Sequence, residues 1–478
     1  MELDKDLAAR QEARQLCARA EEAQRILAAM PQEKLDAITQ QIAQAFSSAA
    51  EELAELAVKE TGFGNVQDKT EKNRFASRDV YAAIRDMKTV GVLSVQEQEK
   101  IWQIGVPVGV IAAIVPSTNP TSTICYKALI ALKAGNAIVF SPHPKALQCS
   151  LRASQIVMDA ARAAGAPDGC VSCLSLASMA GCQELMAAPQ VKLILATGGP
   201  AMVRAAYSSG KPAIGVGAGN GPAYIHHSAD VQHALRCILR SKNFDYGTIC
   251  ASEQSIIVEK SMEDKVRSAA KSMGYYFMST EEAGKLAALL FKPNGTLNPD
   301  IVGRPATELA KKAGFSVPAD TKILVAREQE AGPTRPYSME KLCPVLAFFV
   351  MESEDAVLQK AVEVLTHEGS GHTFAMHCSD ESVVRKFALQ IPVSRFPVNT
   401  PAALGGIGAT TGLFPALTLG CGAVGGSSTS NNISPLDLIN IRRVAWDLEK
   451  QPQKQNVSDD LVEIITSKIL ERLKFERK

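Results

Sequence analysis

Apolar residues recur along the chain with two different periods. Between Leu7 and Ala57 they fall three and four positions apart among Ala, Glu, Gln, Lys and Arg, which predicts amphipathic helices. Pro31 stands where a second helix of this segment can begin. From Ile101 to Val115 the residues are β-branched and interrupted by Gly and Pro, which predicts strands. The chain is therefore expected to open with helices before its first sheet.

The part from Val108 to about Ile225 alternates short apolar runs with helical patterns. Strands are predicted at Val108–Val115, Ala137–Phe140, Val171–Leu176, Lys192–Ala196 and Pro212–Val216, and helices at Ser122–Leu132, Leu147–Ala164, Cys182–Ala188 and Met202–Ser208. Short buried strands that alternate with helices predict a parallel, doubly wound sheet. Because ligands of such sheets lie beyond the carboxyl ends of the strands, the turns after these strands are candidate binding segments.

A second α/β segment runs from about Pro222 to Thr400. Its predicted strands include Ser255–Val258, Ile323–Val325 and Leu346–Val350, and its predicted helices include Met262–Met273 and Asp355–Leu365. Residues 405–434 are dense in Gly, Ser and Thr, and a loop system of this length is typical of a functional segment.

The C-terminal part is predicted to be a helix on a tether. A polar, linker-like run from Glu449 to Asn456 precedes Ser458, which can cap a helix whose first turn carries Asp459 and Asp460. Residues four positions apart then give this helix an apolar face, namely Leu461, Ile465, Ile469 and Leu473.

Composition narrows the class of protein. The 478 residues include 51 basic and 50 acidic side chains, and this balance favours neither nucleic acid nor an anionic membrane as a partner. No signal peptide and no apolar run of bilayer length is visible. Eleven cysteines without framework spacing indicate free thiols in a reducing compartment, so a cytoplasmic location is expected. Cys170 and Cys173 form a lone CxxC without a second pair or a nearby histidine, and no metal site is predicted.

Three segments carry candidate chemistry. Cys250 lies in a small-residue turn between a helix and an apolar strand, where a substrate can reach its thiol, although free cysteine is also among the most buried residue types. Asn119 follows an apolar strand and could donate its amide N–H to an oxyanion, or could serve the Asn-Pro turn alone. Gly198 and Gly199 follow another strand, and such a turn offers backbone N–H groups to a phosphate.

The order and spacing of these segments resemble the aldehyde dehydrogenase superfamily. The closest likeness is to its CoA-acylating branch, which includes the aldehyde dehydrogenase half of bifunctional aldehyde/alcohol dehydrogenases and the enzymes of ethanolamine- and propanediol-type bacterial microcompartments. The resemblance runs from about Leu3 to Asp447. The segments that carry it are Ile114–Ser122, Phe140–Pro144, Ala196–Pro200, Lys211–Asn220, Gly247–Gln254 and Thr418–Gly426.

The resemblance implies a covalent mechanism. Cys250 matches the nucleophile, and Asn119 matches the oxyanion-hole asparagine that acts with the backbone N–H of Cys250. Val216 stands where hydrolytic members carry the glutamate that activates water, and a valine cannot take a proton from water. The acyl group is therefore expected to leave to the thiol of coenzyme A. The base for that step stays open, since His367 and His372 are candidates by residue type alone.

The resemblance also implies a site for NAD. Ser141 and His143 lie where the superfamily has a Lys-Pro-x-Glu strand end beside the adenosine ribose, with Ser141 in place of the usual lysine. Glu340 matches the glutamate that holds the nicotinamide ribose. The turn near the cofactor pyrophosphate is matched by Thr197, Gly198 and Gly199.

The expected fold is α/β and aldehyde dehydrogenase-like, with two Rossmann-like α/β domains and a small β extension for oligomerisation. The expected parts are a cofactor-binding domain at 1–221 with the extension at 92–103, a catalytic domain at 222–404, a return with the oligomerisation strand at 405–448, a linker at 449–457 and a tail helix at 458–478.

The expected activity is the reversible, NAD-dependent oxidation of a short aliphatic aldehyde, acetaldehyde or propionaldehyde, to its acyl-CoA by a homodimer or tetramer. The tail helix is expected either to dock on microcompartment shell or cargo proteins, which would place the enzyme inside a bacterial microcompartment, or to pack on the enzyme body. Two alternatives stay open: a non-acylating enzyme that releases free acid, and a non-catalytic scaffold member. Glu253 is expected at the surface, and six cysteines are expected to be packing residues, namely Cys125, Cys149, Cys237, Cys343, Cys378 and Cys421.

Overall fold

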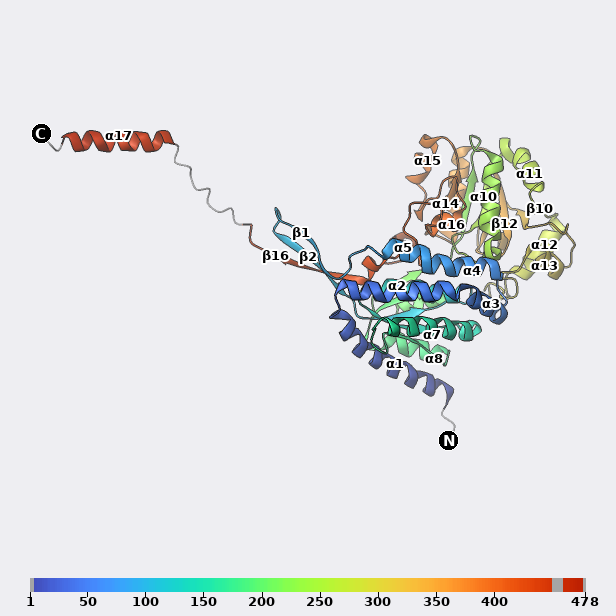
Figure 1. Cartoon of the computed structure of the whole chain (residues 1–478). Helices are drawn as coiled ribbons and strands as arrows, with labels where there is room; N and C mark the ends of the chain where they lie inside the picture. Colours follow the sequence, from blue (N-terminus) through green and yellow to red (C-terminus); the bar gives the residue numbers. More distant parts are fainter. Residues whose placement is uncertain (1–3, 449–458, 476–478) are drawn as a thin grey trace. The chain divides into compact units, whose positions relative to one another are not determined.

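The computed structural model describes residues 4–448 and 459–475 (Figure 1). The chain divides into two units, of which the first comprises the residues up to Gly91 together with Val106–Asn440. The second comprises Val92–Gly105 and the residues from Ile441 onward. Within the described ranges, no helix is long and apolar enough to cross a membrane.

A five-stranded sheet with only parallel pairings lies in the first unit, in the order β5-β4-β3-β6-β7. Its strands are β3 (Val110–Ile114), β4 (Ala137–Ser141), β5 (Val171–Cys173), β6 (Val191–Thr197) and β7 (Ala213–Val216), and its connecting helices are α6 (Pro120–Lys133), α7 (Leu147–Ala163), α8 (Met179–Ala187) and α9 (Pro200–Tyr207). Strands β3 and β4 are buried at every residue, as is typical of a sheet covered on both faces. Because parallel crossovers are right-handed, α6 and α7 cover one face and α8 and α9 cover the other.

Helices from the N-terminal segment complete the cover of this sheet. They are α1 (Lys5–Ala28), α2 (Gln32–Ser48), α3 (Ala50–Thr61), α4 (Val66–Arg74) and α5 (Val80–Ile84), with a π-helical turn at Phe75–Asp79 between the last two. Figure 1 shows α1 beside α8 and α2 beside α7. Small buried residues of α1, spaced three and four apart, let it approach its neighbours closely, namely Ala9, Ala13, Cys17, Ala20 and Ala23.

A second parallel sheet of six strands follows in the order β10-β11-β12-β9-β8-β14. Its strands are β8 (Gly221–Ile225), β9 (Glu253–Glu259), β10 (Tyr275–Phe277), β11 (Ile323–Arg327), β12 (Val345–Met351) and β14 (Ala375–His377). The helices of this part are α10 (Val231–Asn243), α11 (Glu263–Lys271), α12 (Thr280–Leu290), α13 (Ala306–Lys312), α14 (Glu354–His367), α15 (Glu381–Ala388) and α16 (Ala402–Gly406). A separate two-stranded parallel sheet pairs β13 (Gly371–Thr373) with β15 (Val393–Arg395).

The second unit contains a three-stranded sheet and the tail helix. The sheet has the order β1-β2-β16, from β1 (Gly91–Gln96), β2 (Ile101–Pro107) and β16 (Ile439–Ala445). The tail helix is α17 (Asp459–Phe475), and all of its described side chains are exposed. The predicted linker at 449–457, the cap Ser458 and the side chains of Asp459, Asp460 and Leu473 lie outside the described residues.

The predicted α/β class with parallel sheets is confirmed. Boundaries differ by a few residues: the strand expected at Val171–Leu176 ends at Cys173, and the helix expected from Ser122 begins at Pro120, where proline suits the first helical position.

Candidate active site

The carboxyl ends of β3 and β6 lie side by side at the point where the strand order of the first sheet reverses. The chain leaves β3 toward β4 on one side and returns to place β6 on the other, so the turns after these adjacent strands diverge and leave a crevice. Two adjoining cavities, of about 790 and about 320 Å³, occupy this place. Residues common to both linings come from these turns and from facing loops: Pro116, His143, Thr197, Gly198, Gly199, Pro200, Ala218, Leu297 and Glu340.

The larger cavity brings together the residues predicted to hold a cofactor. Ser141 and His143 enter it from the end of β4, and Thr197 enters it from the end of β6. The Thr197 hydroxyl is buried and has no hydrogen-bond partner among the described residues. A Cβ at Gly199 would meet nothing within 4 Å, so the backbone ahead of α9 is open to a ligand. An elongated polar molecule could therefore lie along these turns.

Cys250 lines the smaller cavity. It lies between a 3-10 turn, Phe244–Gly247, and β9, and its residue is partly exposed. Gly219 packs so closely on this segment that a Cβ there would stand 1.8 Å from the carbonyl oxygen of Cys250. The residue at 219 must therefore be glycine for the segment around Cys250 to keep this position.

The thiol of Cys250 is neutral at physiological pH in the unliganded protein. Burial, then the nearby Glu340 and Cys421, raise the pKa of Cys250 to about 12, and the guanidinium of Arg395 only partly opposes them. A thiolate at this position therefore needs a further favourable charge, or proton removal as substrate binds.

We expect alkylation of Cys250 by iodoacetamide to keep accelerating between pH 7 and pH 9 in the unliganded enzyme. The reason is that only the thiolate reacts, and its fraction grows with pH below the raised pKa. The measurement is the rate of Cys250 labelling by peptide mass spectrometry across this range. A plateau near neutral pH would contradict the raised pKa.

Asn119 lines the same cavity as Cys250. It is the N-cap of α6, yet its side chain makes no capping hydrogen bond. Its Nδ2 instead donates to the carbonyl of Thr248 at 3.2 Å and to the hydroxyl of Thr118 at 3.2 Å. The predicted pair, Cys250 and Asn119, thus lines one cavity.

A buried ion cluster that the sequence did not reveal holds Asn119. Lys72 Nζ donates to Asn119 Oδ1 at 2.6 Å, to Asp245 Oδ2 at 2.5 Å and to Thr248 Oγ1 at 2.9 Å. Lys69 Nζ adds a contact of 2.9 Å to the same carboxylate. Burial alone would raise the pKa of Asp245, but the two lysines outweigh it and hold that pKa below its ordinary value. The amide oxygen of Asn119 is thereby fixed, which holds this side chain beside Thr248 in the wall of the smaller cavity.

Glu340 borders both cavities. Its Oε1 accepts the backbone N–H of Gly219 at 2.9 Å, and its own N–H donates to Glu368 at 2.7 Å. Burial, then Glu368, raise the pKa of Glu340 to about 8. Because Glu340 lines both cavities, it lies between the predicted cofactor residues and Cys250.

Several other sequence expectations meet a clear outcome. Val216 lines the smaller cavity, and no carboxylate comes from this position. His372 is fully buried, and burial, then Arg395, lower its pKa to about 3; neither it nor His367 lines the two cavities. The expectation that Glu253 lies at the surface is wrong, because it is 1% exposed and accepts the backbone N–H of Ala402. The six cysteines expected to be packing residues are all buried.

Comparison with known proteins identifies the family. A family model described as the aldehyde dehydrogenase family matches residues 4–273. The chain belongs to the aldehyde dehydrogenase family. Among curated relatives, it is 45% identical over 435 residues to the bifunctional aldehyde-alcohol dehydrogenase AdhE of Escherichia coli, a match that covers 90% of this chain and 49% of that protein. The chain therefore spans about half the length of the bifunctional relatives that it matches.

Solved structures of similar proteins match almost all of this chain. An acetylating aldehyde dehydrogenase from Geobacillus thermoglucosidasius matches with a TM-score of 0.92 and 48% identity, covering 95% of this chain and 100% of that chain. A propionaldehyde dehydrogenase from the fucose utilisation bacterial microcompartment of Clostridium phytofermentans matches with a TM-score of 0.83 and 27% identity, covering 92% of this chain and 98% of that chain. The fold described above is thus that of an aldehyde dehydrogenase.

Proposed function

We propose that this aldehyde dehydrogenase oxidises a short aliphatic aldehyde, propionaldehyde or acetaldehyde, to its acyl-CoA. The observation that carries the proposal is the wall of the Cys250 cavity, in which Val216 occupies the position that hydrolytic members give to a water-activating glutamate. The similar chain named as an acetylating aldehyde dehydrogenase supports the same reaction class. The alternatives are release of free acid and a non-catalytic scaffold.

The residues of the smaller cavity can carry out the covalent steps. Cys250 Sγ attacks the carbonyl carbon and forms a C–S bond, and the resulting alkoxide accepts hydrogen bonds from Asn119 Nδ2 and the backbone N–H of Cys250. Loss of hydride from that carbon converts the thiohemiacetal to a thioester. The sulfur of coenzyme A then forms the new thioester, and Cys250 leaves as the thiolate. One thioester replaces another, so this exchange step is close to thermoneutral and can run in either direction.

The larger cavity suits a nicotinamide dinucleotide. Its volume lies within the range of small-molecule sites, and the unpartnered Thr197 hydroxyl and the open backbone at Gly199 fit a polar, phosphate-bearing ligand. We propose that Ser141 and His143 flank the adenosine ribose, that Thr197, Gly198 and Gly199 lie along the pyrophosphate, and that Glu340 holds the nicotinamide ribose. When bound, NAD supplies the hydride acceptor.

The product distinguishes the proposal from its alternatives. Incubation with propionaldehyde, NAD and CoA should yield propionyl-CoA in equal amount to NADH, as determined by mass spectrometry. Propionate as the main product would favour the hydrolytic alternative, and absence of both products would favour the scaffold.

We further propose that the second unit mediates assembly. Its three-stranded sheet and the residues directly after β16 expose apolar side chains that a sister subunit can cover, namely Val92, Val95, Trp102, Ile441, Trp446 and Leu448. The ring centroids of Trp102 and Trp446 lie 5.1 Å apart, and the two partly exposed rings form an apolar surface that a sister subunit could contact. In this proposal the sheet is the oligomerisation element. Residues 1–221 form the cofactor-binding domain, and residues 222–404 form the catalytic domain that carries Cys250.

We propose that the tail helix targets the enzyme to a bacterial microcompartment by docking on its shell or cargo proteins. Its apolar side chains are about half exposed, from 49% at Val462 to 54% at Leu470. An apolar helix face of this kind suits a groove on another protein. The similar enzyme from a microcompartment supports this assignment.

Deletion of the residues after Pro452 should leave kcat within about twofold and abolish encapsulation, because no described side chain of α17 lines either cavity. Co-purification with shells, compared with the full-length chain, provides the measurement. A full-length variant with Leu461, Ile465 and Ile469 changed to serine is the matched test of the apolar face. Loss of activity on truncation would contradict the targeting role.

A further inference from the structure

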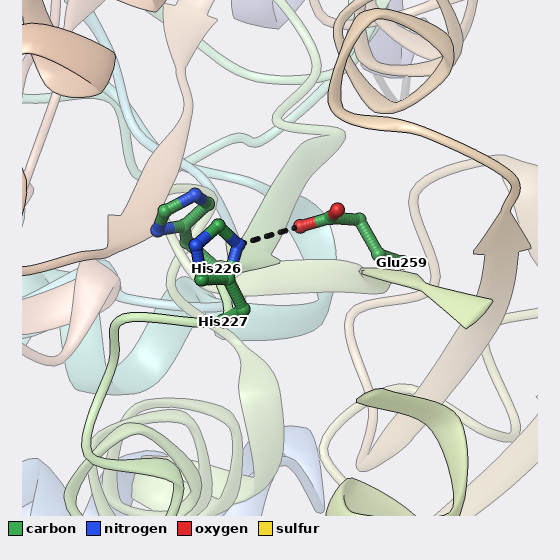
Figure 2. A group of neighbouring side chains, drawn as sticks. All are labelled: His226, His227 and Glu259. Atoms are coloured by element: carbon green, nitrogen blue, oxygen red, sulfur yellow. Dashed lines mark hydrogen bonds and ion pairs between the residues drawn. The ribbon is translucent and has the colours of Figure 1, made fainter. Parts of the chain in front are cut away.

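Two adjacent strands of the second sheet end beside a cluster of two histidines and a glutamate, residue types that can bind metal ions. In the parallel register, Ile225 of β8 pairs with Val258 of β9. The next residues, His226 and Glu259, therefore meet at the same edge, and His227 joins them from the following position (Figure 2). One potential ligand atom from each of these three side chains lies within 4.8 Å of the others.

We propose that His226, His227 and Glu259 bind a divalent transition-metal ion of the zinc class. Two imidazoles and one carboxylate are a donor set that zinc accepts, with a fourth position left for water or a neighbouring carboxylate. His227 Nδ1 already lies 3.3 Å from Glu259 Oε1 (Figure 2). Ligand atoms around a tetrahedral zinc ion stand roughly 3.4 Å apart, given bonds of about 2.1 Å. The 61% exposed side chain of His227 is free to make the small closure that remains.

An unpartnered donor atom in the cluster points independently to a ligand. His226 is 1% exposed, and its Nε2 makes no hydrogen bond to any described residue. This atom lies 3.5 Å from Glu354 Oε2, so a further carboxylate is available to the same ion. A bound ion would give this buried nitrogen the close contact that no hydrogen bond from the described residues provides.

The surrounding groups orient these ligands. His226 Nδ1 is held by Ser228, whose hydroxyl lies 2.8 Å away and whose backbone N–H donates to this nitrogen at 3.3 Å. Binding of a metal ion through Nε2 would require the tautomer with its proton on Nδ1, which can donate to that hydroxyl. Tyr224 donates its hydroxyl to Glu259 Oε1 at 2.8 Å. Such outer partners fix ring orientation and tautomer at metal sites.

The proposed metal site is separate from the catalytic cavities. Cys250 and Gly219 precede β9 and β8, whereas the histidines and Glu259 follow or end these strands. A strand of five residues spans roughly 16 Å, so the length of β8 separates the two places. A metal ion here would brace the strand ends and raise the stability of the fold without entering the reaction.

The test is calorimetric titration of Zn²⁺ into the full chain, without a histidine tag and with Cys250→Ala to remove the reactive thiol. We expect one Zn²⁺ per chain, and a Kd that rises at least tenfold in His227→Ala and in Glu259→Gln. The matched control is His233→Ala, an exposed histidine of α10 outside the cluster, which should bind as before. Absence of binding, or equal affinity in the His227 and Glu259 variants, would overturn the proposal, as would loss of binding in the His233 variant.

Discussion

Replacing Cys250 with alanine should lower the rate of acyl-CoA formation by about 10⁴–10⁶-fold, the usual cost of removing a catalytic nucleophile. Among the described residues, Cys250 is the one cysteine that lines the smaller cavity, so no second thiol is in place to take over the covalent step. The measurement is NADH formation at saturating aldehyde, NAD and CoA.

The chain offers a matched control for this variant. Among its eleven cysteines, Cys250 and Cys173 are the two that are not buried, and Cys173 lies at the end of β5 and lines neither catalytic cavity. Cys173→Ala should therefore retain activity. Substantial NADH formation by Cys250→Ala would remove this residue from the mechanism.

Replacing Asn119 with alanine should lower kcat by about 10²–10³-fold with a smaller change in KM, because an oxyanion donor acts mainly in the transition state. The variant removes the Nδ2 donor and also frees Lys72 from its contact to Oδ1. Steady-state kinetics provide the test, with thermal unfolding as a check that the fold persists. A loss of less than tenfold would show that Asn119 is not a principal oxyanion donor.

A variant of Lys72 distinguishes the positioning of Asn119 from its direct role as a hydrogen-bond donor. Lys72→Met should lower kcat less than Asn119→Ala, because Lys69 still neutralises Asp245 and the amide of Asn119 remains present. The midpoint of thermal unfolding should fall in Lys72→Met more than in Asn119→Ala, since a buried carboxylate loses one of its two partners.

Local sequence patterns were sufficient to predict the elements that form the crevice. Asn119 and Thr197 each follow an apolar run, and the carboxyl ends of parallel strands share one edge of a sheet, so their convergence was predictable. Their meeting with Cys250 was implied by family resemblance alone, because it depends on how the second part of the chain packs against the first.

Contacts between distant residues could not be predicted in this way. Lys72 lies in the polar helix α4, which has the pattern of a surface helix, yet its partner Asp245 is 173 positions away. Glu253 looked like a surface charge, but the N–H of Ala402 makes its burial possible. The pairing of His226 with Glu259 depends on the register of β8 against β9, which neither strand reveals by itself.

The fate of the Cys250 thioester distinguishes the acylating mechanism from release of free acid. The decisive measurement is the time course of NADH formation from propionaldehyde and NAD at a high enzyme concentration, without CoA and then after CoA is added. If CoA resolves the thioester, the first phase should stop at about one NADH per active site, and sustained turnover should begin on addition of CoA. Sustained NADH formation without CoA, with propionate as the product, would contradict the acylating mechanism.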